Sequence, residues 1–198
     1  MPIMPGNQAY RWKPSRPVSV FQSTVNEFMN ERQMSLGSDY RPDFDPAGWL
    51  VSEKMNGVRA FWDGCKFWTR SGNVIDAPAW LTADLPSVHL DGELWAGRGR
   101  FEESRQAVQL RRWMPAMRFT AFDAPNVCGA WRERLEAAGR AWHDVVTIEM
   151  CKGHGWLMDR LKVVQDGGGE GLVIRSPKEK RYRIGRGAFL KVKAWSPS

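Results

Sequence analysis

The chain has 198 residues, which is enough for one domain with a hydrophobic core of its own. Its hydrophobic fraction of 42% and charged fraction of 26% are typical of a globular protein and argue against a mostly disordered chain. No apolar run approaches the roughly 18 residues that cross a membrane, and the N-terminus lacks the apolar core of a secretory signal. Three widely spaced cysteines favour free thiols in a reducing compartment, so we expect a cytoplasmic protein without a membrane partner.

The charge is unevenly distributed along the sequence. Lys and Arg number 29 against 22 Asp and Glu, a formal net charge of +7. Much of the excess lies between Lys178 and Lys193, where the only acid is Glu179. A basic stretch of this kind favours a polyanionic partner, and a solvated basic face is the alternative.

The first quarter of the chain predicts little regular structure. Residues 1–20 are rich in Pro, Arg and Ser and predict an irregular arm. Residues 23–34 have a helical pattern with Ser23 or Thr24 as the N-cap, and the prolines and glycine of residues 40–48 predict a loop. We therefore separate an N-terminal arm and helix, residues 1–47, from a main domain, residues 48–198.

The main domain predicts more strands than helices. The first three strands are separated by short turns and predict an antiparallel meander; the predicted strands cover residues 49–54, 58–64, 65–70, 87–95, 117–124, 145–150, 170–176 and 189–195. Helical spacing covers residues 101–113, 130–142 and 155–166. Because strands and helices do not alternate strictly, we expect an α+β fold with largely antiparallel sheets.

Lys54 and Arg59 flank a short turn in the segment KMNGVR. A hairpin of this kind can hold both cations toward one cleft, where a neutral lysine amine is a nucleophile and an arginine is a forked donor to phosphate or sugar oxygens. Asp91 and Glu93 are two residues apart on a predicted strand, so their carboxylates share one side and can bind a divalent metal or a ribose. For Lys54 and Arg59 the alternative is an ordinary surface hairpin, and for Asp91 and Glu93 it is a charged strand end.

Two further motifs lie near the C-terminus. The glycines before Glu170 permit close approach of the backbone to a ligand, although a flexible turn before a core strand is the alternative. Lys191 and Lys193 alternate with apolar residues, so their amines share one face and suit a polyphosphate. An edge strand protected by lysines against aggregation is the alternative for this pair.

In this order, the motifs resemble the covalent nucleotidyltransferase superfamily of ATP-dependent DNA ligases, RNA ligases and mRNA capping enzymes. The segment KMNGVR is similar to the nucleophile motif KxDGxR, and TRSG at residues 69–72 is similar to the motif that follows it. LDGELW, FTAFDAP, EGLVIR and LKVK are similar to the remaining motifs. The likeness is strongest to small bacterial and phage ATP-dependent DNA ligases and runs from residue 49 to residue 195.

The resemblance implies an ATP-grasp-like nucleotidyltransferase (adenylation) domain, in which antiparallel sheets are flanked by helices. It implies an enzyme that seals nicked double-stranded DNA in repair, replication or recombination, as a monomer, in a bacterial or phage-infected cell. In this chemistry the lysine attacks the α-phosphate of ATP and forms lysyl-AMP, AMP passes to a DNA 5′-phosphate, and a 3′-hydroxyl then displaces it. Phosphoryl transfer of this kind depends mainly on positioning and charge neutralisation.

The resemblance also implies roles for individual residues. Lys54 would be the catalytic nucleophile, and a cationic cleft would help to lower its pKa. The nucleotide would be bound by Ser52, Glu53, Arg59, Glu93, Phe122, Lys191 and Lys193, with Phe122 on the adenine and Arg59 and Glu93 on the ribose. Glu170 and Asp91 would hold Mg²⁺ or Mn²⁺, and Arg70, Arg98 and Arg186 would contact nucleic acid, with Arg70 at the nick phosphate.

Two features depart from the family pattern. Asn56 stands where the family usually has Asp. The asparagine side chain keeps the capacity to form hydrogen bonds but lacks the negative charge of aspartate. Only five residues follow Lys193, so we expect no C-terminal OB-fold domain. An RNA ligase or another nucleotidyltransferase, and a non-catalytic nucleic-acid-binding module, therefore stay as alternatives to a DNA ligase.

Overall fold

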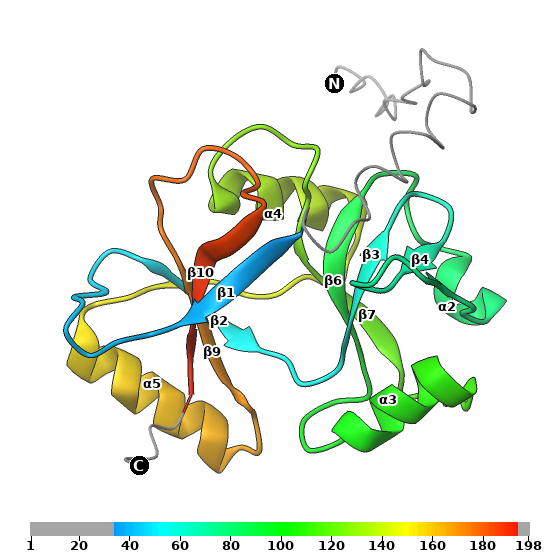
Figure 1. Ribbon diagram of the computed structural model, residues 1–198, viewed down its shortest axis with the longest axis horizontal. Helices are drawn as coiled ribbons and strands as arrows, with labels where there is room; N and C mark the ends of the chain where they lie inside the picture. Colours follow the sequence, from blue (N-terminus) through cyan, green and yellow to red (C-terminus); the bar gives the residue numbers. More distant parts are fainter. Residues whose placement is uncertain (1–33, 194–198) are drawn as a thin grey trace, which may run out of the picture.

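The computed structural model describes residues 34–193, which form two five-stranded β-sheets with helices packed beside them (Figure 1). The arm and most of the helix predicted before residue 34 lie outside the described residues. The α+β class with largely antiparallel sheets is confirmed. Within residues 34–193, no helix is both long and apolar enough to cross a membrane.

The first sheet has the strand order β1-β10-β9-β2-β8. Its strands are β1 (Ser35–Asp39), β2 (Leu50–Lys54), β8 (Glu149–Met150), β9 (Gly171–Arg175) and β10 (Gly185–Val192). All neighbours pair antiparallel except β1 and β10, which are parallel. The sequence did not predict β1, it predicted β8 four residues too long, and it started β10 four residues too late.

The second sheet has the order β5-β4-β3-β6-β7, and all its pairs are antiparallel. Its strands are β3 (Val58–Trp62), β4 (Phe67–Trp68), β5 (Val74–Ile75), β6 (Leu90–Trp95) and β7 (Arg118–Asp123). The prediction of a meander through β2, β3 and β4 is therefore wrong at its first step, because β2 and β3 belong to different sheets.

Gly57 permits the close approach to β6 that the chain makes as it crosses from the first sheet to the second. A Cβ atom at Gly57 would collide with the backbone oxygen of Leu94 and, at 2.6 Å, with the side chain of Trp95. The Gly57 N–H also donates to Glu93 Oε1 at 3.1 Å. Asn56-Gly57 is a sequence typical of hairpin turns, but here the glycine allows the backbone to pass close to β6.

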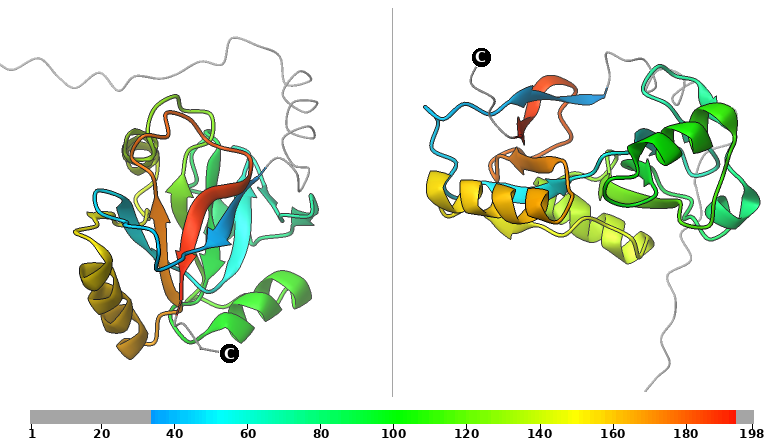
Figure 2. Two further views of the ribbon diagram at one scale, coloured as in Figure 1. Left: turned by 60° about the vertical axis from the view of Figure 1, so that its left-hand side comes forward. Right: turned by 90° about the horizontal axis from the view of Figure 1, so that it is seen from below.

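The helices are α2 (Ala79–Thr82), α3 (Phe101–Leu110), α4 (Trp131–Ala141) and α5 (His154–Asp166). Helices α5 and α3 cover the faces of the first and second sheet that point away from the space between the sheets (Figure 2). Helix α4 packs beside β7, and its first residue, Trp131, reaches the pocket between the sheets. Leu157 and Leu161 of α5 pack with Leu172 and Ile174 of β9, while Ala107 of α3 joins the core of the second sheet. Alternate residues of the strands are therefore buried under helices, and the others are left to face the opposite sheet.

Candidate active site

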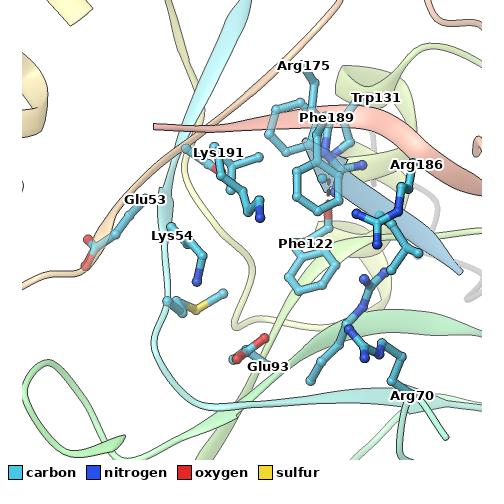
Figure 3. Close-up of a pocket in the computed structure, with 16 residues that line it drawn as sticks. Glu53, Lys54, Arg70, Glu93, Phe122, Trp131, Arg175, Arg186, Phe189 and Lys191 are labelled. Atoms are coloured by element: carbon cyan, nitrogen blue, oxygen red, sulfur yellow. Dashed lines mark hydrogen bonds between the residues drawn. The ribbon is translucent and has the colours of Figure 1, made fainter. Parts of the chain in front are cut away.

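A pocket of about 340 Å³ lies between the two sheets and is lined by residues of both. Its size is in the range of small-molecule sites. Figure 3 shows Lys54 and Lys191 pointing into the same space, with Phe122 and Glu93 on the other side of it. The chain segments that supply these residues are far apart in sequence, so this arrangement exists only in the folded protein.

Strand register places the residues from the first sheet on one face. Ser52 and Lys54 of β2 lie opposite Val173 and Gly171 of β9, and Lys191 of β10 also lies opposite Val173. A Cβ atom at Gly171 would collide with the backbone oxygen of Val192. Glycine at this position therefore lets β9 and β10 approach each other beside the amine of Lys54.

The amine of Lys54 forms an ion pair with Glu170 Oε2, and Lys193 Nζ approaches Glu170 Oε1 at 2.6 Å. Partial burial works against ionisation of Glu170, but hydrogen bonds and charge from Lys193 and Lys54 outweigh it and lower the pKa of Glu170. One carboxylate thus holds the predicted nucleophile and a predicted phosphate-binding lysine together.

Arg59 is fixed by a second carboxylate at the edge of the pocket. Its Nε donates to Asp91 Oδ1 at 3.0 Å and its Nη2 to Asp91 Oδ2 at 2.5 Å. Its Nη1 donates to the backbone oxygen of Ser35 at 2.6 Å. Burial works against the charge of Arg59, but Asp91 raises the pKa of Arg59 above its ordinary value. Lys54 and Arg59 therefore line one pocket, as expected, but from two sheets and not from one hairpin.

Glu93 lines the pocket next to this pair. Burial raises the pKa of Glu93 to about 7, while the nearby Lys54 charge and the Gly57 N–H favour the ionised form. Asp91 does not line the pocket, because its carboxylate is fully buried and both oxygens accept bonds from Arg59. Asp91 and Glu93, which the sequence places on one side of a strand, thus differ in their surroundings: Glu93 lines the pocket, whereas Asp91 is buried against Arg59.

Aromatic rings and a buried arginine form the far wall of the pocket. The guanidinium carbon of Arg175 lies 4.5 Å from the ring centre of Trp131, 5.1 Å from that of Phe189 and 5.9 Å from that of Phe122. Arg175 Nη1 donates to Asp123 Oδ2 at 2.5 Å. This interaction ties β9 of the first sheet to β7 of the second, directly behind Phe122.

The predicted nucleic-acid contacts do not all lie together. Arg70 and Arg186 line the pocket on its Phe122 side. Arg98 instead donates to both oxygens of Glu53, at 2.8 and 2.7 Å, on an exposed surface. Figure 3 shows Glu53 pointing away from Lys54, as expected for the next residue of a strand.

Sequence reasoning missed several pocket residues, among them Trp131, Arg175 and Phe189. It also missed Tyr182, which does not line the pocket but contacts Arg59. The sequence places Trp131 at the start of a helix and Arg175 at the end of a core strand, where each has an ordinary structural explanation. Phe189 precedes the predicted site residue Lys191 by two positions on β10, so the period of two on a strand is a signal that could have identified it. No predicted site residue gives such a signal for Arg175.

The surroundings of Glu170, which pairs with Lys54 but does not line the pocket, set limits on a metal site. Among the described residues, no group of three or more His, Cys, Asp or Glu side chains is placed to hold a metal ion. Glu170 therefore offers a single carboxylate. This fits a Mg²⁺ or Mn²⁺ ion that takes most of its ligands from substrate phosphates and water, which is common for Mg²⁺.

Comparison with known proteins identifies relatives. No protein-family model matches the sequence. A curated DNA ligase of Haemophilus influenzae is 33% identical over 156 residues, which cover 74% of this chain and 58% of that protein. A solved structure from a structure-function study of Lig E DNA ligases is 35% identical with a TM-score of 0.73, and the match covers 81% of this chain and 68% of that one.

A third relative supports the fold alone. The structure of Chlorella virus DNA ligase-adenylate has a TM-score of 0.65 at 21% identity, and the match covers 81% of this chain and 67% of that one. The nucleotidyltransferase fold expected from the motifs is confirmed by these structures. The chain spans a little over half the length of the curated relative that it matches.

Proposed function

Because the chain belongs to the family of ATP-dependent DNA ligases, we propose that it seals nicks in DNA through a lysyl-AMP intermediate. The observation that carries this proposal is the pocket itself. Lys54 from one sheet shares it with Arg59, Glu93 and Phe122 from the other sheet. A nucleophile, a polar pair and an aromatic ring around one space are what transfer of a nucleotide to a lysine requires.

The proposed reaction has three steps. Lys54 Nζ, once it has lost a proton, attacks the α-phosphorus of ATP; the new N–P bond forms as the bond to pyrophosphate breaks. A DNA 5′-phosphate oxygen then attacks the same phosphorus and releases Lys54. Finally the adjacent 3′-hydroxyl attacks the activated 5′-phosphate, and AMP leaves.

Each wall of the pocket has a part in binding the nucleotide. Phe122 and Val173 line it from opposite sheets, so a base between them is covered on both faces. Arg59 and Glu93 would hold the ribose. Lys191 lines the pocket near Lys54 and would neutralise the phosphates. Ser52 lies on the same strand face as Lys54 and would close the pocket beneath the nucleotide.

Glu170 would hold the divalent cation together with the phosphates of ATP. The cation would neutralise charge on the transferred phosphoryl group. Glu170 pairs with the amines of both Lys54 and Lys193. A cation bound to this carboxylate would weaken both ion pairs, which would leave Lys54 to face the pocket and Lys193 to bind the phosphates.

Nicked duplex DNA is the proposed partner of the basic surface. Arg70 and Arg186 lie at the pocket and would meet the nick phosphate, whereas Arg98 is engaged with Glu53 and would need to leave that pair. The side chains of Lys178 and Lys180 are exposed and would contact the DNA phosphate backbone near the nick. We propose that the protein acts on DNA as a monomer and in the cytoplasm, where ATP and DNA are both present.

The experiment that tests this function uses ATP labelled at the α-phosphate, with Mg²⁺ and a nicked duplex. We expect label on the wild-type protein, then on the DNA 5′-end, and finally a sealed strand. Lys54→Ala should not become labelled. Lys162→Ala is the matched control, because it removes an exposed lysine paired with Asp166 on α5, and it should become labelled as the wild type does.

Other outcomes assign the protein differently. Sealing of RNA ends in preference to DNA would identify an RNA ligase. Binding of DNA without any label on wild-type protein would identify a non-catalytic module, and Asn56→Asp would then test whether the missing carboxylate is the cause. Label on Lys54→Ala would contradict the assignment of the nucleophile.

A further inference from the structure

Tyr182 lies on the connection between β9 and β10, in the most basic part of the sequence. Its neighbours Arg181 and Arg183 are exposed, whereas its own side chain turns inward and reaches Asp91 of the other sheet. Tyr182 does not line the pocket. Its position next to Arg59 nevertheless links it to the nucleotide site.

The hydroxyl group of Tyr182 takes part in three hydrogen bonds. It donates to Asp91 Oδ2 at 2.7 Å, and it accepts from the backbone N–H of Ser35 at 3.1 Å and from Arg59 Nη2 at 3.3 Å. Burial and the charge of Asp91 raise the pKa of Tyr182, so the hydroxyl stays protonated and remains a donor to that carboxylate.

These bonds enclose the guanidinium of Arg59 with groups from both sheets. Asp91 lies beside Arg59 in the second sheet, where the two residues are on neighbouring strands. Ser35 and Tyr182 come from β1 and from the connection that leads into β10, both of the first sheet. Without Tyr182, Asp91 and Ser35 would still hold Arg59, but among residues 34–193 no hydrogen bond from the first-sheet side would fix the direction of the Asp91 carboxylate.

We propose that Tyr182 is a positioning residue for the nucleotide: it orients Arg59, through Asp91, toward the bound ribose. This inference rests on the proposed function, in which Arg59 binds the ribose. It adds a residue that does not touch the nucleotide and that comes from the connection between β9 and β10. Because Tyr182 contacts Arg59 and Asp91 whereas the Lys54 amine is held by Glu170, Tyr182 should set nucleotide affinity and leave the chemistry at Lys54 unchanged.

The test measures affinity and chemistry separately on the full chain. Affinity is measured by calorimetric titration with the α,β-methylene analogue of ATP, which cannot transfer AMP, and chemistry by the rate of self-labelling at saturating ATP. Tyr182→Phe should raise both the Kd of the analogue and the KM for ATP about tenfold, the effect of losing one or two hydrogen bonds. The labelling rate at saturation should stay within about twofold of the wild type.

Tyr40→Phe is the matched control. It also removes a hydroxyl with two hydrogen-bond partners, Phe44 O at 3.0 Å and His154 Nδ1 at 2.8 Å, but beside α5 and away from the pocket. It should change neither Kd nor KM. Melting temperatures of both variants establish whether they fold. If Tyr182→Phe is unstable, Ser35→Ala takes its place, because it removes a hydroxyl that accepts from Arg59 Nη2 at 3.2 Å. Ser35→Ala should also raise the Kd of the analogue.

A double-mutant cycle shows whether Tyr182 acts through Arg59. In an Arg59→Lys background, Tyr182→Phe should have no further effect on Kd. Independent, additive effects would overturn the inference, as would an unchanged Kd in Tyr182→Phe. If wild-type protein is not labelled by ATP at all, the proposed function fails; if it is labelled normally and Tyr182→Phe binds the analogue like wild type, only this inference fails.

Discussion

The amine of Lys54 and the carboxylate of Glu170 form an ion pair at the junction of β2 and β9, and the same carboxylate binds Lys193. Both side chains of this pair are mostly buried, at 23% and 18% exposure. In the proposed reaction, the Lys54 amine would have to leave this ion pair before it attacks the nucleotide.

Glu170→Gln should slow self-labelling with ATP by about 100-fold, since it removes the charge that would hold the cation and orient Lys54. The rate is measured by single-turnover labelling at saturating ATP. Glu149→Gln is the control, because Glu149 is an exposed carboxylate of β8 that pairs with Arg160 of α5 and does not line the pocket. An unchanged rate in Glu170→Gln would exclude Glu170 from the chemistry.

The raised pKa of Glu93 predicts how stability depends on pH. The carboxyl has a pKa of about 7 in the folded protein and an ordinary value of 4.5 when exposed, so the folded state binds more protons between these values. The stabilisation is therefore complete below pH 4.5 and is lost as the pH rises to about 7. Because the pocket is open to water, we expect a loss of roughly 2 kcal/mol, less than full burial would give.

Urea unfolding at several pH values checks this expectation. Glu93→Gln should show a flatter fall in the free energy of unfolding between pH 5 and pH 8 than the wild type, by roughly 2 kcal/mol. Identical pH profiles for the two proteins would mean that Glu93 titrates normally.

Phe122→Ala should weaken binding of the ATP analogue by about 10- to 100-fold, because stacking of a base on an aromatic ring contributes about 1–3 kcal/mol. Phe122→Trp keeps an aromatic face and should bind within a few-fold of the wild type. Titration calorimetry provides the measurement. Equal affinities for the alanine and tryptophan variants would show that the base does not stack on this ring.

Asp123 is fully buried and forms ion pairs with two arginines. Arg134 Nε lies 2.7 Å from its Oδ1, and Arg175 Nη1 lies 2.5 Å from its Oδ2. Asp123→Ala should lower the free energy of unfolding by about 3–5 kcal/mol, because it leaves two buried cations without their carboxylate. Denaturant titration measures the change. Asp159→Ala, on the exposed face of α5, should cost less than about 0.5 kcal/mol.

The basic connection between β9 and β10 predicts a dependence of DNA binding on salt. Lys178→Ala combined with Lys180→Ala should reduce the slope of log affinity against log salt by about two, one for each lost phosphate contact. Arg132→Ala combined with Arg140→Ala removes the same charge from the exposed face of α4 and serves as the control. Equal slopes for the two double variants would place the DNA elsewhere.

The sequence by itself determined the family, the order of most elements and the identity of the residues in the motifs. Lys54, Glu93 and Lys191 could be identified because each lies in a short motif, KMNGVR, LDGELW or LKVK, and the structure places all three at one pocket. Such a motif is a local property, since its few residues follow one another along the chain.

Only the tertiary structure decided which strands pair. The Asn56–Gly57 turn predicts a hairpin, yet β2 and β3 join different sheets, because the packing of Gly57 against Leu94 and its bond to Glu93 depend on β6, more than thirty residues away. Tyr182 and Arg175 join the site for the same reason. Their partners, Asp91 and Asp123, come from the opposite sheet, and no local pattern encodes contacts that are set by the docking of two sheets.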